Sequence, residues 1–167
     1  IIVAGIYIAI GLLLYFNTEN LTFAPEKLSK NYAFHFNQKF EELNLVTKNN
    51  QILNGLLFKA DSSKGVIFYL HGNAESLKEW GTIAKTYTDL HYDVFMLDYP
   101  GYGKSDGKIS SQKQLYQAMQ TAYDSIKLRY TENKIIVLGY SIGTGLAAKI
   151  ASTNNPKLLI LQAPYCN

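Results

Sequence analysis

One serine lies in a sequence context that can turn its hydroxyl into a nucleophile. An apolar run from Ile135 to Leu138 comes before it and small residues follow it, so a buried strand, a sharp turn and a helix are expected. The turn is the five-residue run Gly139-Tyr140-Ser141-Ile142-Gly143. This arrangement is typical of a nucleophile elbow, which presents one hydroxyl at the carboxyl edge of a parallel sheet. Because the pattern also occurs by chance, the alternative is an ordinary strand-to-helix turn with an incidental serine.

A second group of residues is suited to stabilising negative charge. His71, Gly72 and Asn73 follow another apolar strand. Attack by a serine on a carbonyl creates an oxyanion, and loss of one N–H donor to it typically costs about 3 kcal/mol of barrier. We expect the donors to be the backbone N–H groups of Ile142 and Asn73, with Gly72 letting the loop bend inward. Since His71 lies on the oxyanion side, we expect it to shape the loop and not to act as the base.

The elements that must position these residues alternate between strand and helix. Strands are expected at residues 65–70, 94–98, 134–138 and 158–162, and helices at 77–92, 112–130 and 142–153. An antiparallel hairpin, residues 41–47 and 52–59, is expected to precede them. Short apolar strands separated by helices predict a parallel sheet covered on both faces. The predicted fold class is therefore α/β, a three-layer sandwich with a mostly parallel sheet and an N-terminal antiparallel hairpin.

Three motifs in this order resemble the α/β-hydrolase family: FYLHGNA at 68–74, LDYPGYGKS at 97–105 and GYSIGTG at 139–145. The chain is most similar to the serine aminopeptidase-like branch with its membrane-anchored members, from about Phe40 to the end. The resemblance implies that Ser141 is the nucleophile and that Asn73 and Ile142 form the oxyanion hole. It implies a structural loop near the pocket at 98–103. Gly139, Tyr140 and Gly143 would shape the site.

The resemblance also implies a catalytic acid and then a histidine after the serine in chain order. All three histidines, His35, His71 and His91, precede Ser141. We therefore predict that the acid, the base and the last strands of the sheet lie beyond Asn167. A serine hydroxyl without a base is a poor nucleophile at neutral pH, so the 167-residue chain alone is expected to be inactive.

The first sixteen residues are almost wholly apolar, slightly fewer than the roughly 20 that span a bilayer. We predict a transmembrane anchor at residues 1–16, a juxtamembrane connector at 17–39 and the hydrolase domain at 40–167. A signal peptide is the first alternative, but no basic segment precedes the run. A buried core helix is the second, but no polar face interrupts the run.

Composition argues against several other classes of protein. The net charge is +3, and fifteen of the sixteen basic residues are scattered lysines, which disfavours a nucleic-acid reader. The single cysteine excludes an internal disulfide, and no Cys/His cluster has metal-ligand spacing. Residues 103–105 and 143–148 resemble parts of phosphate-binding motifs, but the flanking residues do not fit. No metal and no cofactor are expected.

The sequence therefore favours a membrane-bound serine hydrolase that acts on an ester, a thioester or an amide. Its expected substrate is a small or acylated molecule. Two alternatives stay open. The first is a catalytically inactive α/β-hydrolase-like binding protein or truncated pseudoenzyme, and the second is a serine peptidase.

Overall fold

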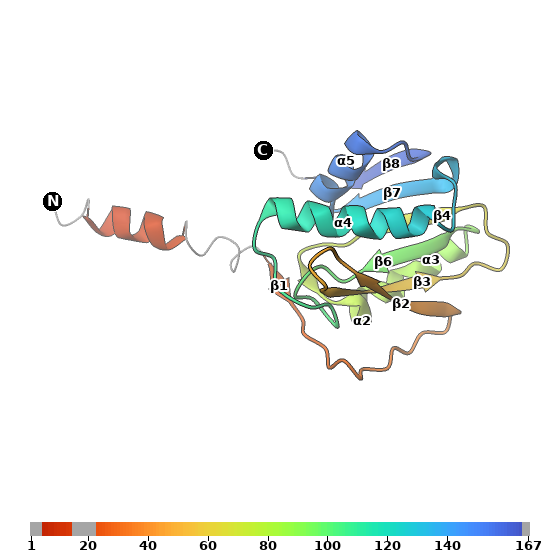
Figure 1. Ribbon diagram of the computed structural model, residues 1–167, viewed down its shortest axis with the longest axis horizontal. Coiled ribbons are helices and arrows are strands. Elements are labelled where there is room, and N and C mark those ends of the chain that lie inside the picture. Colours follow the sequence, from red (N-terminus) through yellow and green to blue (C-terminus); the bar gives the residue numbers. More distant parts are fainter. Residues whose placement is uncertain (1–4, 15–22, 165–167) are drawn as a thin grey trace.

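A six-stranded sheet forms the centre of the computed structural model, which describes residues 5–14 and 23–164 (Figure 1). Its strands are β2 (Phe40–Val46), β3 (Ile52–Phe58), β4 (Val66–Leu70), β6 (Asp93–Leu97), β7 (Ile135–Tyr140) and β8 (Leu158–Gln162). They lie in the order β2-β3-β6-β4-β7-β8. The pairs β4–β6, β4–β7 and β7–β8 are parallel, whereas β2–β3 and β3–β6 are antiparallel. The predicted mostly parallel sheet with an antiparallel hairpin is confirmed.

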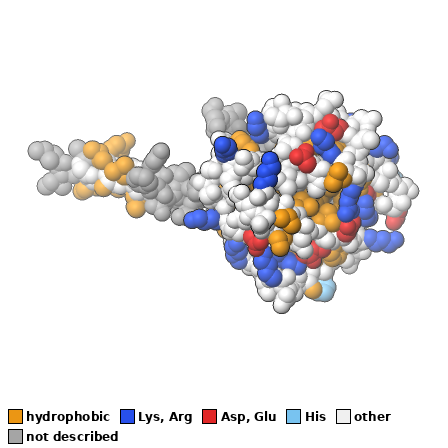
Figure 2. All heavy atoms as spheres, viewed as in Figure 1, with side chains coloured by type: hydrophobic (Ala, Val, Ile, Leu, Met, Phe, Trp, Pro, Cys, Tyr) orange, Lys and Arg blue, Asp and Glu red, His pale blue; other side chains and the backbone are white. Residues whose placement is uncertain are grey.

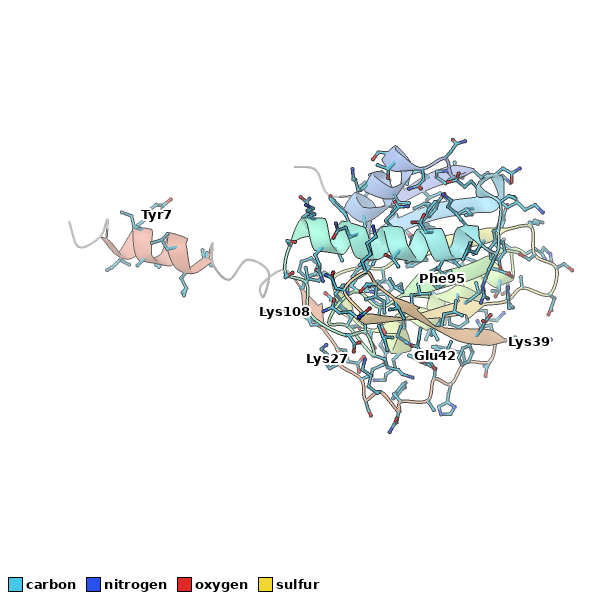
Figure 3. The ribbon with its side chains drawn as sticks, viewed as in Figure 1. Tyr7, Lys27, Lys39, Glu42, Phe95 and Lys108 are labelled. Atoms are coloured by element: carbon cyan, nitrogen blue, oxygen red, sulfur yellow. The ribbon has the colours of Figure 1, made fainter. Side chains whose placement is uncertain are left out.

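Helices cover both faces of the sheet. They are α2 (Leu77–Trp80), α3 (Ala84–Thr88), α4 (Gln112–Lys127) and α5 (Gly143–Thr153). Successive residues of β4 point to opposite faces: Phe68 packs in the core cluster that contains α4 and α5, and Tyr69 in the one that contains α2 and α3. Phe95 of β6 belongs to the α4 side of the core (Figure 3). The result is the three-layer sandwich that the alternating pattern predicted.

The helix expected at residues 77–92 is interrupted and shorter. A 3₁₀ turn, η1 (Gly81–Ile83), separates α2 from α3. The ring of Phe36 packs so closely on Gly81 that a Cβ atom there would lie 2.4 Å from it. The helix then ends at Thr88, and the chain turns at His91, which has a φ of 67°. The interruption thus coincides with a contact from a distant part of the chain, which local periodicity does not reveal. A second 3₁₀ turn, η2 (Glu132–Lys134), precedes β7.

The second half of the predicted connector packs against the domain. Residues 24–25 form β1 (Ala24–Pro25), which pairs in parallel with β5 (Ala74–Glu75). The Glu26 carboxylate accepts a hydrogen bond from Ser76 Oγ at 2.6 Å and pairs with Lys78 Nζ at 3.0 Å. Phe34 is only 7% exposed. We call residues 23–28 the N-terminal strap. The start of the hydrolase domain at Phe40 stays a prediction. The strap precedes that boundary in the chain, but it is fixed to the loop that follows β4.

Residues 5–14 form a helix whose large apolar side chains are exposed (Figure 2), with Tyr7 at 80%. The predicted transmembrane anchor at residues 1–16 lies partly outside the described residues. Within the described part of the chain, no helix combines the length and the apolar character that a bilayer crossing needs. The anchor therefore stays a prediction. At the other end, β8 is an edge strand with Leu158 49% exposed.

Candidate active site

Ser141 lies at the turn between β7 and α5, at the carboxyl edge of the parallel strands. It has a φ of 51°, a left-handed conformation that is uncommon for a residue with a side chain. Its backbone N–H donates to the carbonyl of Gln162 at 2.9 Å, and its carbonyl accepts from Thr144 N at 3.0 Å. These bonds to β8 and to the first turn of α5 hold the strained turn in place. Ser141 itself is partly exposed.

Glycines on both sides of the serine allow the close approach that the elbow needs. A Cβ atom on Gly139 would lie 2.4 Å from the carbonyl oxygen of Gly143. A Cβ atom on Gly143 would lie 2.1 Å from the carbonyl oxygen of Leu70. The helix α5 therefore begins directly against the end of β4, where any side chain would push the two elements apart.

The N-terminus of α5 is directed at the same edge. Ile142 is its N-cap residue, and no side chain in the described part of the chain caps this end of the helix. The first N–H groups of a helix have no partner within the helix, and they carry partial positive charge. The residue that follows Ser141 therefore lies where a backbone donor can face a developing oxyanion.

The loop after β4 is held at several points. The Tyr99 hydroxyl donates to the carbonyl of His71 at 2.7 Å, and the Tyr102 hydroxyl donates to the carbonyl of Asn73 at 2.7 Å. The backbone N–H of Ala24, in the strap, donates to the same Asn73 carbonyl at 3.0 Å. Three contacts from two distant segments thus fix the loop that was expected to supply the second oxyanion donor.

His71 is fully buried among aromatic rings. It stacks on Tyr99 with 3.9 Å between ring centroids and lies 5.8 Å from the Trp80 ring. Its Nδ1 hydrogen-bonds the carbonyl of Gly72 at 2.7 Å. Burial lowers the pKa of His71 to about 4, so the ring is neutral at pH 7. An enclosed, neutral imidazole is suited to shaping the loop, which is the role the sequence predicts for it.

Gly72 and Tyr140, both expected to shape the site, lie against Trp80. A Cβ atom on Gly72 would lie 3.0 Å from the Trp80 ring and 3.4 Å from the Tyr140 ring. The rings of Trp80 and Tyr140 are 5.5 Å apart. The Trp80 Nε1–H donates to the carbonyl of Ala74 at 2.8 Å, which fixes the far end of the same loop.

The predicted structural loop at 98–103 folds over a buried carboxyl. Asp98 is fully buried and accepts from the backbone N–H of Leu77 at 3.0 Å. Gly103 has a φ of 44°, and a Cβ atom there would lie 1.9 Å from the Asp98 carboxyl. Burial raises the pKa of Asp98 to about 7. The loop therefore wraps the carboxyl and at the same time delivers Tyr99 and Tyr102 to the loop after β4.

The sequence matches the family described as serine aminopeptidase, S33, over residues 61–167. The chain belongs to this family of α/β-hydrolases. A lysophosphatidylserine lipase, ABHD12, of Gallus gallus is 35% identical over 113 residues, which cover 64% of this chain and 29% of that protein. Protein bem46 of Schizosaccharomyces pombe is 31% identical, over 78% of this chain and 46% of its own length. The chain thus spans less than half of these two relatives.

Solved structures confirm the fold. An α/β-hydrolase from Vibrio vulnificus superposes with a TM-score of 0.65 at 28% identity, over 75% of this chain and 45% of that one. An esterase from Pyrococcus furiosus also gives a TM-score of 0.65, at 19% identity, over 86% of this chain and 56% of its own. The second similarity concerns the fold alone.

The family's catalytic acid and histidine are not recognisable near Ser141 among the described residues. His71 is enclosed by rings, and His35 is exposed on the segment that precedes β2. His91 lies in the turn before β6, at the amino edge of the sheet, whereas Ser141 is at the carboxyl edge. In residues 5–14 and 23–164, no group of three His, Cys, Asp or Glu side chains is arranged to hold a metal ion.

His71 and Asp98 are expected to give folding stability opposite pH dependences. The folded-state pKa of His71 is below its ordinary 6.5, so the unfolded chain binds the proton first. As the pH falls from 7 to 5, this should cost about 2 kcal/mol of unfolding free energy. The folded-state pKa of Asp98 is above its ordinary 3.8, so the folded chain binds the proton first. Over the same pH range, this should add about 2 kcal/mol.

Two variants separate these opposing effects. In Asp98→Asn only the histidine contribution is left, so the unfolding free energy should fall on acidification from pH 7 to 5. In His71→Phe only the carboxyl contribution is left, so it should rise. Urea unfolding at the two pH values measures both changes. Equal pH dependence in wild type and both variants would show that neither group titrates in this range.

Sequence reasoning missed the strap and the tyrosine hydroxyls as supports of the loop after β4. Ala24 binds the loop through its backbone N–H, a group that almost every residue type has, so its identity as alanine does not predict the contact. Tyr99 and Tyr102 belong to a motif that was recognised as a loop, but their hydrogen-bond partners depend on the folded arrangement.

Proposed function

We propose that the protein is a serine hydrolase that cleaves an ester, a thioester or an amide through an acyl-enzyme intermediate. The observation that carries this proposal is the geometry of Ser141, a residue with a side chain at positive φ between a parallel strand and a helix. Such strain persists where the surrounding structure enforces it, and it clusters at functional sites. An incidental serine in this turn would gain nothing from the strain.

In the proposed mechanism, Ser141 Oγ attacks the carbonyl carbon and the carbonyl oxygen becomes an oxyanion. The backbone N–H groups of Ile142 and Asn73 donate to that oxygen. Collapse of the tetrahedral intermediate expels the alcohol, thiol or amine and leaves the acyl group on Ser141. Water then attacks the acyl-enzyme and releases the carboxylic acid.

A histidine must accept the Oγ proton and pass it to the leaving group. The ring of His71 is enclosed, and His35 and His91 lie away from Ser141. We therefore assign the base and its acid to residues that follow Asn167, in the family's chain order. The match covers only 29% and 46% of the two relatives, so proteins of this family contain further residues that can complete the site. The isolated chain should then be inactive.

Esters are the favoured substrates. One of the relatives named above is a lysophosphatidylserine lipase, which supports a small acylated molecule as the substrate. A peptidase activity is supported only by the description of the family. The exposed apolar helix at residues 5–14 supports attachment of residues 1–16 to a membrane.

Labelling of the full-length protein with a fluorophosphonate probe tests the proposal. We expect a covalent adduct that maps to the peptide carrying Ser141 and that is absent from Ser141→Ala. Failure of the folded protein to react would overturn the proposal and favour an inactive binding protein. Faster cleavage of aminoacyl arylamides than of aryl esters would instead support the peptidase alternative.

A further inference from the structure

The strap joins the two loops that follow β4 and β6. In the loop after β4, the carbonyl of Asn73 accepts from the backbone N–H of Ala24 at 3.0 Å. The carbonyl of Glu75, in the same loop, accepts from the backbone N–H of Glu26 at 3.2 Å. From the loop after β6, the backbone N–H of Gly103 donates to the carbonyl of Glu26 at 2.7 Å. Glu26 therefore binds both loops through its backbone.

The sequence of the strap fits this arrangement. In an extended segment every second N–H points the same way, so Ala24 and Glu26 can both donate to the loop after β4. Pro25, which has no N–H, lies between them at the position where no donor is needed. Lys27, labelled in Figure 3, then forms a parallel bridge with Gly103. The strap thus passes from one loop to the other without losing a hydrogen bond to its proline.

Glu26 also fixes the strap through its side chain. Its carboxylate accepts from Ser76 Oγ at 2.6 Å and pairs with Lys78 Nζ at 3.0 Å. Ser76 is fully buried and is the N-cap residue of α2. A hydrogen bond to an ionised acceptor is roughly twice as strong as one between neutral groups. The Glu26 carboxylate therefore holds the strap against the start of α2.

The loop that the strap holds contains a strained residue. Glu75 has a φ of 70°, in the left-handed region, although it is exposed. Strain of this kind persists only where the surrounding structure enforces it. The strap binds the carbonyl of Glu75 and that of Asn73, two residues earlier. If the strap were released, Glu75 could return to a negative φ, and this rotation of the backbone would displace Asn73.

The peptide group between Gly72 and Asn73 is oriented from the other side. The carbonyl of Gly72 hydrogen-bonds His71 Nδ1 at 2.7 Å. The C=O and N–H groups of a trans peptide point in opposite directions, so this bond directs the N–H of Asn73 away from the His71 ring. The strap then fixes the carbonyl of Asn73. The direction of the proposed oxyanion donor thus depends on one bond before it and one after it.

Resting on the proposed hydrolase function, we infer that Glu26 is a positioning residue for the reaction. Through the strap it holds Asn73 where the backbone N–H of that residue meets the oxyanion. Glu26 acts from a distance and does not contact the reacting atoms. An interaction that is made only in the transition state changes kcat and leaves ground-state binding unaltered. A segment that precedes the hydrolase domain then contributes to the rate of the reaction.

Steady-state hydrolysis of p-nitrophenyl acetate by the full-length protein tests this inference. Glu26→Ala should lower kcat/KM about tenfold to a hundredfold, because loss of an oxyanion donor costs about 10²–10³ in rate. Glu26→Gln keeps an oxygen for Ser76 and loses the charge, so its loss should be smaller. Ala24→Pro removes the N–H that binds the carbonyl of Asn73 and should act like Glu26→Ala. Urea unfolding shows which variants are folded, and any folded one of the three carries the test.

Glu41→Ala is the matched control. The Glu41 carboxylate also accepts two side-chain hydrogen bonds, both from Arg129, but it lies at the amino edge of the sheet. This variant should keep the wild-type kcat/KM. Equal kcat/KM in Glu26→Ala and Glu41→Ala would overturn the inference.

Two inhibitors distinguish a change in the oxyanion site from a general loosening. An alkyl trifluoromethyl ketone forms a tetrahedral adduct with the serine and places an oxyanion in the site, whereas the matching methyl ketone binds like a ground state. In Glu26→Ala the inhibition constant of the first should rise by the factor by which kcat/KM falls. That of the second should change less than about twofold. Equal rises for both ketones would overturn the inference.

Hydrogen exchange separates this inference from the proposed function. In the Ser141→Ala background, Glu26→Ala should speed amide exchange in residues 72–76 at least about tenfold, and Glu41→Ala should not. If no ester is hydrolysed but this faster exchange is seen, the hydrolase proposal fails and the hold of the strap on the loop stands. If wild type and Glu26→Ala hydrolyse esters equally fast, the inference fails and the hydrolase proposal stands.

Discussion

Replacing Ser141 by alanine is expected to lower kcat/KM for ester hydrolysis by about four to six orders of magnitude in the full-length protein. Removal of the nucleophile leaves only the contributions of the oxyanion donors and of substrate binding. Stability should change little, because alanine adopts the same left-handed conformation with similar strain. The kinetics are measured with a short aryl ester, and urea unfolding confirms that the variant is folded.

Ser141→Gly tests the strained turn independently of the chemistry. Glycine adopts a φ of 51° without the cost of a Cβ atom, so the unfolding free energy should rise by about 1 kcal/mol while activity is lost. Such a gain in stability on removal of a catalytic residue is the expected trade-off at a functional site. Retention of more than about 1% of wild-type activity in Ser141→Ala would exclude Ser141 as the nucleophile.

Gly143→Ala is expected to have the largest effect on folding. The added Cβ atom would lie 2.1 Å from the carbonyl oxygen of Leu70 and 2.7 Å from that of His71. Both neighbours are backbone atoms, so a side-chain movement cannot relieve the collision, and α5 must move away from β4. We expect a loss of about 3 kcal/mol of unfolding free energy, at the upper end of the range for overpacked sites.

Gly11→Ala is the matched control, because a Cβ atom at Gly11 has no neighbour within 4 Å. Urea unfolding compares the two variants with wild type. Gly11→Ala should leave stability close to that of wild type, whereas Gly143→Ala should shift the midpoint strongly. If Gly143→Ala unfolded like the control, the close contact between α5 and the end of β4 would be wrong, and with it the position of the elbow.

The sequence by itself determined the layered α/β fold and the position of the elbow. Both depend on local signals: continuous apolar runs make buried parallel strands, and glycines around Ser141 permit a turn in which helix and strand nearly touch. The antiparallel hairpin was predictable for the same reason, since its two strands are neighbours in the chain. The family resemblance added the order of the motifs and the expected roles of their residues.

Only the tertiary structure decided where the predicted helices are interrupted and which distant residues hold the loops of the site in place. Phe36 packs on Gly81, in the 3₁₀ turn that divides a helix predicted as continuous. Ala24 fixes the Asn73 loop from a segment that was predicted to be a connector. The low pKa of His71 arises from burial among rings brought from α2 and from the loop that follows β6. A hollow beside Ile142 is lined by residues that are far apart in the sequence, among them Phe23 and Leu146. Contacts between residues this far apart leave no periodic or local pattern in the sequence, so the folded chain alone reveals them.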